Sequence, residues 1–187
     1  MSRDWDITFG YWGAPPSNTE QEKCGNAERA IRKAIAGSAS LASKDIRVFV
    51  QGSYANGTNV RQDSDVDVCV LYTEAFFSDY ELAESGMSDA KLGYTDATYD
   101  YSTFKTDVLN ALTTYFDREH VARGNKAIDI RENTYRVDAD VVPCFEHRLF
   151  EGGLLNSTFR EGTQLFADDG AKIVNWPKQN YDNGVAE

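Results

Sequence analysis

Two aspartates separated by one residue, Asp65 and Asp67, begin an apolar run that continues to residue 72. Successive side chains of a β-strand point to opposite faces, so both carboxylates project from one face. Paired carboxylates on a half-buried strand repel each other and lose solvation. A divalent cation such as Mg²⁺ removes that conflict because it takes oxygen ligands and keeps positions for a substrate phosphate. The pattern indicates a metal site, and a solvated acidic edge that discourages aggregation is the alternative.

A second pair of alternating aspartates, Asp138 and Asp140, lies just before the apolar run Val141-Val142-Pro143. Three carboxylates from two neighbouring strands can hold two cations about 3.5–4 Å apart, as in-line displacement at phosphorus requires. Periodicity puts Asp138 and Asp140 on the same face, so it leaves open which of them is the ligand.

A glycine-serine turn, Gly52-Ser53, precedes Asp65 by twelve residues. Backbone amides freed at such a turn, together with a small hydroxyl, can cradle phosphate oxygens. Gly-Ser is a common turn dipeptide, so the turn indicates a phosphate site only in combination with the aspartates. Four basic residues are candidates for steadying phosphate charge, although a solvated surface role is the simpler interpretation of any single one: Arg61, Lys126, Arg136 and Lys178.

The first half of the chain predicts a helix and two strands that would position these residues. Ser17-Asn18-Thr19-Glu20 reads as a capping box, and apolar residues then recur at helical spacing until Gly37. Strands are predicted over 46–50, which leads into Gln51-Gly52-Ser53, and over 65–72. Phe76 and Phe77 suggest a short helix, and 85–101 reads as a long surface loop.

The second half predicts one helix and several strands. Ser102 is a candidate cap for a helix whose apolar stripe runs from Phe104 to Phe116. Strands follow at 127–131 and 134–142, and a hairpin joins 164–167 to 171–174 through a turn at Asp169-Gly170. The predicted fold class is α+β, a twisted mixed β-sheet flanked by helices on one side, with the metal site at its exposed end.

Composition bounds the remaining possibilities. The 187 residues are 41% hydrophobic and carry a formal net charge of −11, so one globular domain is expected and binding to a long nucleic acid is disfavoured. Cys24, Cys69 and Cys144 are odd in number and far apart, which favours buried thiols in a reducing compartment. No signal peptide or membrane span is readable, so we expect a cytoplasmic protein.

Three segments together resemble the polymerase-β-like nucleotidyltransferases: Gln51-Gly52-Ser53-Tyr54, Asp65-Val66-Asp67 and Asp140-Val141-Val142-Pro143. Within that superfamily the chain is similar to the bacterial CD-NTases, relatives of cyclic GMP-AMP synthase. Residues 124–126, 139–143 and 175–179 also resemble that group, and the resemblance spans about Trp12 to the end.

The resemblance implies roles for individual residues. Asp65, Asp67 and Asp140 would be the catalytic metal ligands for two Mg²⁺ ions, with Mn²⁺ as a substitute, and Asp140 is chosen because it directly precedes the Val-Val-Pro run. Gln51, Gly52 and Ser53 would bind the nucleotide. Residues 1–187 would form the catalytic domain, with 1–16 as an extension, and the helical lobe that follows this core in family members is not found before Glu187.

The function implied by the resemblance is magnesium-dependent joining of NTPs into a cyclic di- or oligonucleotide signal for antiphage defence, read by a separate effector protein. An alternative enzyme would transfer a nucleotide to an antibiotic, tRNA or protein. A third alternative is a non-catalytic nucleotide-binding module. His120 and His147 lack partners at metal-ligand spacing, and no Ser/His/Asp arrangement is readable.

Overall fold

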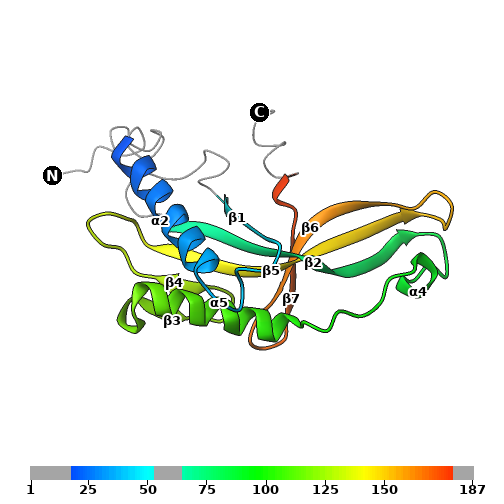
Figure 1. Ribbon diagram of the computed structural model, residues 1–187. Helices are drawn as coiled ribbons and strands as arrows, with labels where there is room; N and C mark the ends of the chain where they lie inside the picture. The colour runs from blue at the N-terminus through cyan, green and yellow to red at the C-terminus, as the bar shows by residue number, and fades with distance from the viewer. Residues whose placement is uncertain (1–17, 53–64, 179–187) are drawn as a thin grey trace, which may run out of the picture.

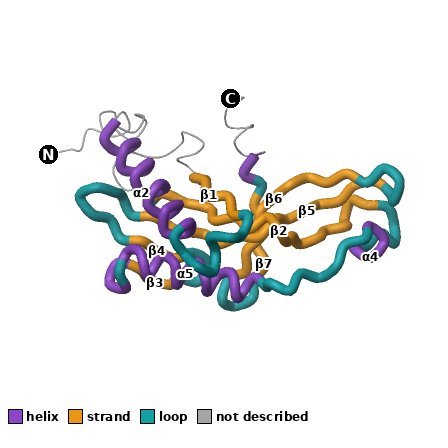
Figure 2. Tube along the Cα trace, viewed as in Figure 1, coloured by secondary structure: helices purple, strands orange, loops and turns teal. Residues whose placement is uncertain are grey.

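The computed structural model describes residues 18–52 and 65–178, so Ser17, Ser53 and Arg61 lie outside the described residues. The described chain forms one mixed sheet with helices, as the sequence predicts (Figures 1 and 2). The elements in chain order are α2 (Asn18–Ala36), β1 (Ile46–Gln51), β2 (Val66–Ala83), α4 (Asp89–Leu92), α5 (Tyr101–Phe116), the 3₁₀ helix η1 (Arg118–His120), β3 (Val121–Arg123), β4 (Ile128–Ile130), β5 (Ala139–Gly152), β6 (Thr158–Phe166) and β7 (Lys172–Asn175).

The centre of the sheet is the parallel pair of long strands β2 and β5. Strand β1 pairs antiparallel with β2, while β4 and β6 pair antiparallel with the first and second parts of β5. Strand β3 extends the sheet beyond β4, and β7 extends it beyond β6. The far parts of β2, β5 and β6 continue past α2 and α5 as a long arm, with the short helix α4 beside it (Figure 1).

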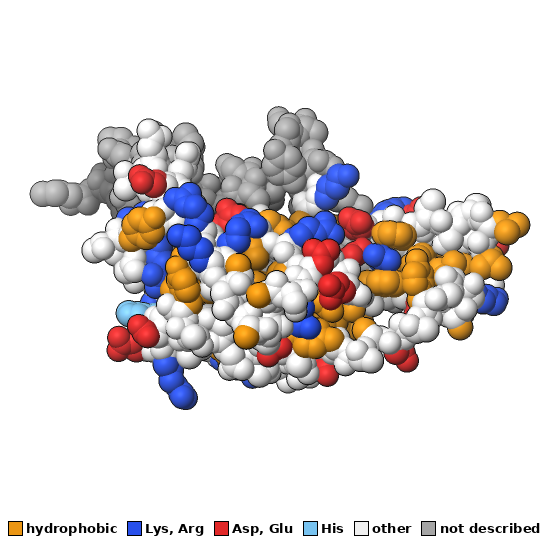
Figure 3. Space-filling model, viewed as in Figure 1, with side chains coloured by type: hydrophobic (Ala, Val, Ile, Leu, Met, Phe, Trp, Pro, Cys, Tyr) orange, Lys and Arg blue, Asp and Glu red, His pale blue; other side chains and the backbone are white. Residues whose placement is uncertain are grey.

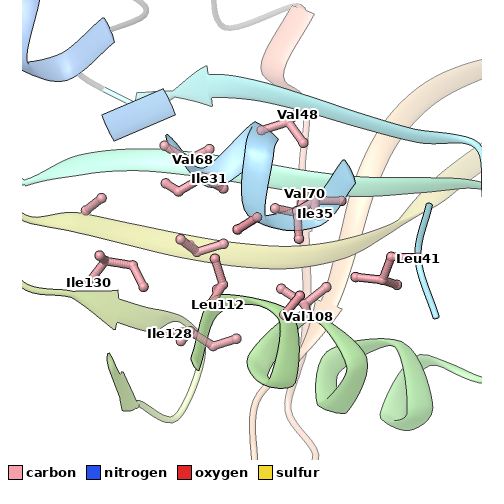
Figure 4. Close-up of a cluster of buried hydrophobic side chains, with 14 of the residues drawn as sticks. Ile31, Ile35, Leu41, Val48, Val68, Val70, Val108, Leu112, Ile128 and Ile130 are labelled. Carbon is pink, nitrogen blue, oxygen red and sulfur yellow. The ribbon is translucent and has the colours of Figure 1, made fainter. Parts of the chain in front are cut away.

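Alternation along the strands divides the sheet into two faces. Val66, Val68 and Val70 of β2 face helices α2 and α5, where they pack with Ile31 and Leu112 in the main hydrophobic core (Figure 4). Each of these five side chains is fully buried, and burying such a side chain contributes about 1.5–3 kcal/mol. The residues between the valines therefore project from the face that α2 and α5 leave uncovered.

That second face carries a smaller apolar cluster of Cys69, Leu71, Val142, Cys144 and Leu165. Strands β6 and β7 contribute to it through Leu165 of β6, which belongs to the cluster, and Ile173 of β7, which packs against it. The three cysteines are buried free thiols, which confirms the expectation from their spacing.

The predicted helix at Phe76 and Phe77 is wrong, because both residues lie within β2. Tertiary contacts hold them there: the guanidinium of Arg148 lies 3.8 Å from the Phe76 ring centroid, and the Phe77 ring stacks on Phe145 at 5.6 Å. Apolar side chains also gather on the outside of the arm (Figure 3), where Leu82 and Phe159 are exposed.

Three other expected boundaries differ from the structure. Asp100, rather than Ser102, caps α5, since its side chain accepts a hydrogen bond from the Thr103 amide. The strand predicted over 134–142 begins only at Ala139 and continues to Gly152. The segment predicted as a loop over 85–101 contains the short helix α4. No helix within the described ranges is long and apolar enough to cross a membrane.

A buried lysine joins α5 to two turns of the sheet. Lys105 Nζ, in a side chain only 7% exposed, donates to the Asn125 carbonyl at 3.0 Å and to Asp168 Oδ1 at 2.8 Å. Arg123 donates to the same carboxylate oxygen at 2.9 Å. The hydrogen bonds from Arg123 and Lys105 lower the pKa of Asp168 to about 2.

We expect Asp168→Asn to lower the melting temperature at neutral pH, because Lys105 would lose its charged partner while remaining buried. A folded-state pKa below the ordinary value of 3.8 stabilises the fold above that value, and the contribution is lost as pH falls through about 2. The melting temperature of the wild type should therefore fall more steeply between pH 5 and 2 than that of the variant. Thermal unfolding with Asp96→Asn as an exposed control measures this, and parallel pH profiles would contradict it.

Candidate active site

The glycine bend after β1 touches the first acidic strand. Gln51, the last residue of β1, lies opposite Asp67 in the antiparallel register with β2. Gly52 has a φ of +72°, and a Cβ added there would overlap Asp67 Oδ2. Only glycine combines this backbone conformation with so close an approach. The bend and the Asp67 carboxylate thus form one continuous site, while Ser53 lies outside the described residues.

Asp67 and Asp140 are direct neighbours across the parallel pair β2–β5. Adjacent strands lie about 4.8 Å apart, and residues in register share a face, so the two carboxylates project side by side. Asp65 stands immediately before β2 and is exposed. The sequence-predicted residues Gln51, Gly52, Asp67 and Asp140 are therefore brought together on the face opposite α2 and α5.

The pKa values of Asp67 and Asp140 are both raised, because these two carboxylates are partly buried and lie near other negative charges. Burial, and secondly the Asp65 charge, raises the pKa of Asp67. Burial raises the pKa of Asp140 to about 6, with further contributions from the carboxylates of Asp129, Asp65, Asp67 and Asp138. A positive charge at this place would relieve the repulsion.

Asp138 is engaged differently from Asp140, although both belong to the same alternating run. Its carboxylate accepts a hydrogen bond from the Glu132 backbone amide, and its carbonyl accepts one from the Val66 amide at 3.1 Å. These contacts tie the Asp138 carboxylate to the segment before β5 and its carbonyl to the start of β2. Asp140, by contrast, lies opposite Asp67, and among the described residues the Glu132 amide donates to Asp138 and not to Asp140.

The donor set fits a hard divalent cation, since carboxylate oxygens are the ligands such ions take. In the part of the chain that the structure describes, no three His, Cys, Asp or Glu side chains already stand close enough together to form a metal cage. The fit therefore rests on the adjacent pair Asp67 and Asp140, with Asp65 at the edge of the strand. Mg²⁺ suits such a place because it commonly uses one or two protein carboxylates plus waters and phosphate oxygens.

A cavity of about 540 Å³ opens beside Asp67 and runs along the uncovered face of the sheet. This volume is within the range of small-molecule sites. Its lining is mixed, with apolar side chains such as Phe49 and Leu71 beside charged ones such as Arg47 and Asp67. The lining residues are Arg47, Phe49, Val50, Gln51, Gly52, Asp67, Leu71, Glu146, Glu161, Gly162, Thr163, Asn175, Pro177 and Lys178.

The basic residues that were candidates for binding phosphate have different roles in the structure. Lys178 lines the cavity, so it can approach an anionic ligand there. Arg136 is buried, donates to the Arg131 carbonyl at 3.0 Å, and stacks on the Phe116 ring, which is a structural role. His147 is also structural, since its Nδ1 lies 2.9 Å from Gln164 Oε1 in the protein interior.

Some residues of the site were not identified from the sequence. Asp129 lies opposite Asp140 across β4–β5, and its alternation with Ile128 and Ile130 was a signal that could have found it. Glu146 and Thr163 carry no such signal. They enter the cavity only because β5 continues beyond Pro143 and pairs with β6.

The nucleotidyltransferase domain family matches residues 31–149 of this chain. The chain is 50% identical over 185 residues to a cyclic dipyrimidine nucleotide synthase CdnE of Legionella pneumophila, covering 99% of this chain and 62% of the relative. It is 41% identical over 176 residues to the enzyme of the same name from Cecembia lonarensis, covering 94% of this chain and 58% of that relative.

A solved structure shares the fold. The Rhodothermus marinus CdnE c-UMP-AMP synthase, solved with Apcpp and Upnpp, superposes with a TM-score of 0.78 at 30% identity. The match covers 96% of this chain and 59% of that chain. This chain thus spans about three fifths of the length of the proteins it matches.

Proposed function

This chain belongs to the nucleotidyltransferase domain family, among its CD-NTases, and on that premise we propose that it joins NTPs into a cyclic di- or oligonucleotide. The observation that carries the proposal is the adjacency of Asp67 and Asp140 beside the Gly52 bend and the cavity. The two relatives named above are dipyrimidine synthases, so we propose that UTP and CTP are among the substrates.

In the proposed reaction, a ribose hydroxyl of one nucleotide attacks the α-phosphate of an NTP. The new oxygen–phosphorus bond forms as the bond to the β-phosphate oxygen breaks, and pyrophosphate leaves with that electron pair. Asp140 accepts the hydroxyl proton in this assignment, while the bend at Gly52 and Ser53 and the side chain of Lys178 orient the triphosphate.

Asp65, Asp67 and Asp140 would hold the divalent metal ions that the nucleotidyltransferase family generally uses, with Mg²⁺ as the proposed ion. The metal would supply charge stabilisation for the phosphate oxygens. The resemblance to CD-NTases extends the proposal to antiphage signalling in the cytoplasm, with the product read by a separate effector protein.

The test is incubation of the purified protein with all four radiolabelled NTPs and Mg²⁺, followed by mass spectrometry. A small phosphatase-resistant product formed without an added acceptor supports the proposal. A product that requires an antibiotic, tRNA or protein acceptor would support the alternative transferase. Calorimetric NTP binding without turnover at any protein concentration would support a binding module.

A further inference from the structure

Strand β7 leads directly into the cavity wall. It contains only four residues, and among the described strands it pairs with β6 alone. The residues that follow it bring Pro177 and Lys178 to the cavity, beside Asn175 at the end of the strand. A short strand with one hydrogen-bonded neighbour is weakly held by its backbone, so side-chain contacts decide where the chain after it lies.

The ring of Trp176 makes one such contact. It lies edge-on to the ring of His147, with the two centroids 5.4 Å apart and an interplanar angle of 82°. Edge-to-face rings at this separation attract each other. His147 is only 1% exposed, and its Nδ1 donates to Gln164 Oε1 at 2.9 Å. The ring that Trp176 meets therefore has a fixed orientation.

A glycine on β6 allows Trp176 to approach so closely. A Cβ added at Gly162 would lie 2.9 Å from the Asn175 carbonyl oxygen and 3.0 Å from Trp176 Cε3. The carbonyl belongs to the backbone of β7, so a side chain at position 162 would displace the strand. The position of Trp176 and of the end of β7 thus depends on this glycine.

An acidic residue links the other end of β7 to the same histidine. Asp79 Oδ2 of β2 lies 3.7 Å from His147 Nε2 and 3.7 Å from Lys172 Nζ. Lys172 is the first residue of β7, and Trp176 directly follows the last. The Lys172 side chain is 49% exposed, and an ion pair of this kind contributes little. The contact between Trp176 and His147 is therefore the main side-chain restraint on this end of the sheet.

We propose that Trp176, held by His147 and Gly162, is a positioning residue that directs Lys178 toward the triphosphate, an inference that rests on the proposed function. Pro177 alone separates the anchored ring from Lys178, and its pyrrolidine restricts the backbone between them. Lys178 is exposed and has a long side chain, so fixing its backbone lowers the entropy that is lost when the ammonium binds phosphate.

The test is a double-mutant cycle measured by calorimetry with inorganic tripolyphosphate and Mg²⁺. Trp176→Ala and Lys178→Ala should each lose about tenfold in affinity, because the first variant releases the ammonium that the second removes. The double variant should also lose about tenfold, whereas independent contributions would multiply to about 100-fold. Trp176→Phe should stay within about threefold of the wild type, since its ring still meets the edge of His147.

Two further variants separate positioning from a general loss of stability. Gly162→Ala displaces Trp176 while keeping its ring, so it should also lose about tenfold and add nothing to the effect of Lys178→Ala. Tyr135→Ala removes an aromatic side chain that is 61% exposed and is not one of the cavity-lining residues, so its affinity for tripolyphosphate should be unchanged. The melting temperature of each preparation shows that the variant is folded.

The outcomes are distinct. A loss of about 100-fold in the double variants, or unchanged affinity in folded Trp176→Ala and Gly162→Ala variants, overturns this inference, while the function carried by Asp67 and Asp140 stands. Unchanged affinity in Lys178→Ala has the same consequence. A wild-type protein that binds neither tripolyphosphate nor any NTP in the presence of Mg²⁺ overturns both.

Discussion

Replacing Asp67 with asparagine is expected to abolish pyrophosphate release from NTPs, with a loss of about 100- to 1,000-fold or more. Asparagine keeps the shape of the side chain but removes the charge that lies beside Asp140. The fold should be retained or stabilised at neutral pH, because burial already disfavours the Asp67 charge. Pyrophosphate release and thermal unfolding of the same preparation measure the two effects. Asp65→Ala and Asp140→Asn should behave in the same way.

Two controls make this expectation specific. Asp138→Asn alters a carboxylate on the same alternating run that is tied to the Glu132 amide, so turnover should survive. Asp96→Asn alters an exposed carboxylate outside the cavity and should have no effect. Unchanged pyrophosphate release from Asp67→Asn, or an equal loss from Asp138→Asn, would show that the assigned aspartates are not the ligands.

Gly52→Ala is expected to weaken NTP binding and turnover by about 100-fold. The added Cβ would overlap Asp67 Oδ2, so the carboxylate and the bend must move apart. Gly93→Ala is a matched control, because Gly93 has a similar φ of +78° but nothing within 4 Å of an added Cβ. Both variants carry the cost of a left-handed alanine, roughly 1–2 kcal/mol of stability. Only Gly52→Ala should also lose activity, and equal activities would contradict this account.

The triphosphate binding proposed above would take place in a protein with a net charge of −11. The carboxylates of Asp67 and Asp140 repel phosphate directly, so nucleotide binding should require a divalent cation between them. The cavity adds Lys178 on its wall and an apolar stretch at Phe49. The negative charge is thus compatible with a nucleotide substrate when metal and nucleotide bind together.

Local alternation was enough to predict which face of the sheet Asp67 and Asp140 occupy. The Asp67 side chain projects from the opposite face of the sheet to Val66 and Val68, which pack against the helices. The period of two along a strand determines this without any long-range contact. The helix now labelled α2 and the hairpin of β6 and β7 were predicted for the same reason. Their signals, a capping box, helical spacing and an Asp-Gly turn, lie within a few residues of each other.

The sequence by itself therefore determined the α+β class, the buried thiols and the set of acidic and glycine residues that make up the candidate site. Only the tertiary structure decided that Asp140 is opposite Asp67, that Asp138 is tied to Glu132, and that Glu146 and Thr163 line the cavity. The local pattern determines which face a strand residue occupies, but the partner it meets on a strand far away in the chain depends on packing across the whole sheet. The same reason accounts for Phe76 and Phe77, whose strand conformation depends on contacts with Arg148 and Phe145 about seventy residues away.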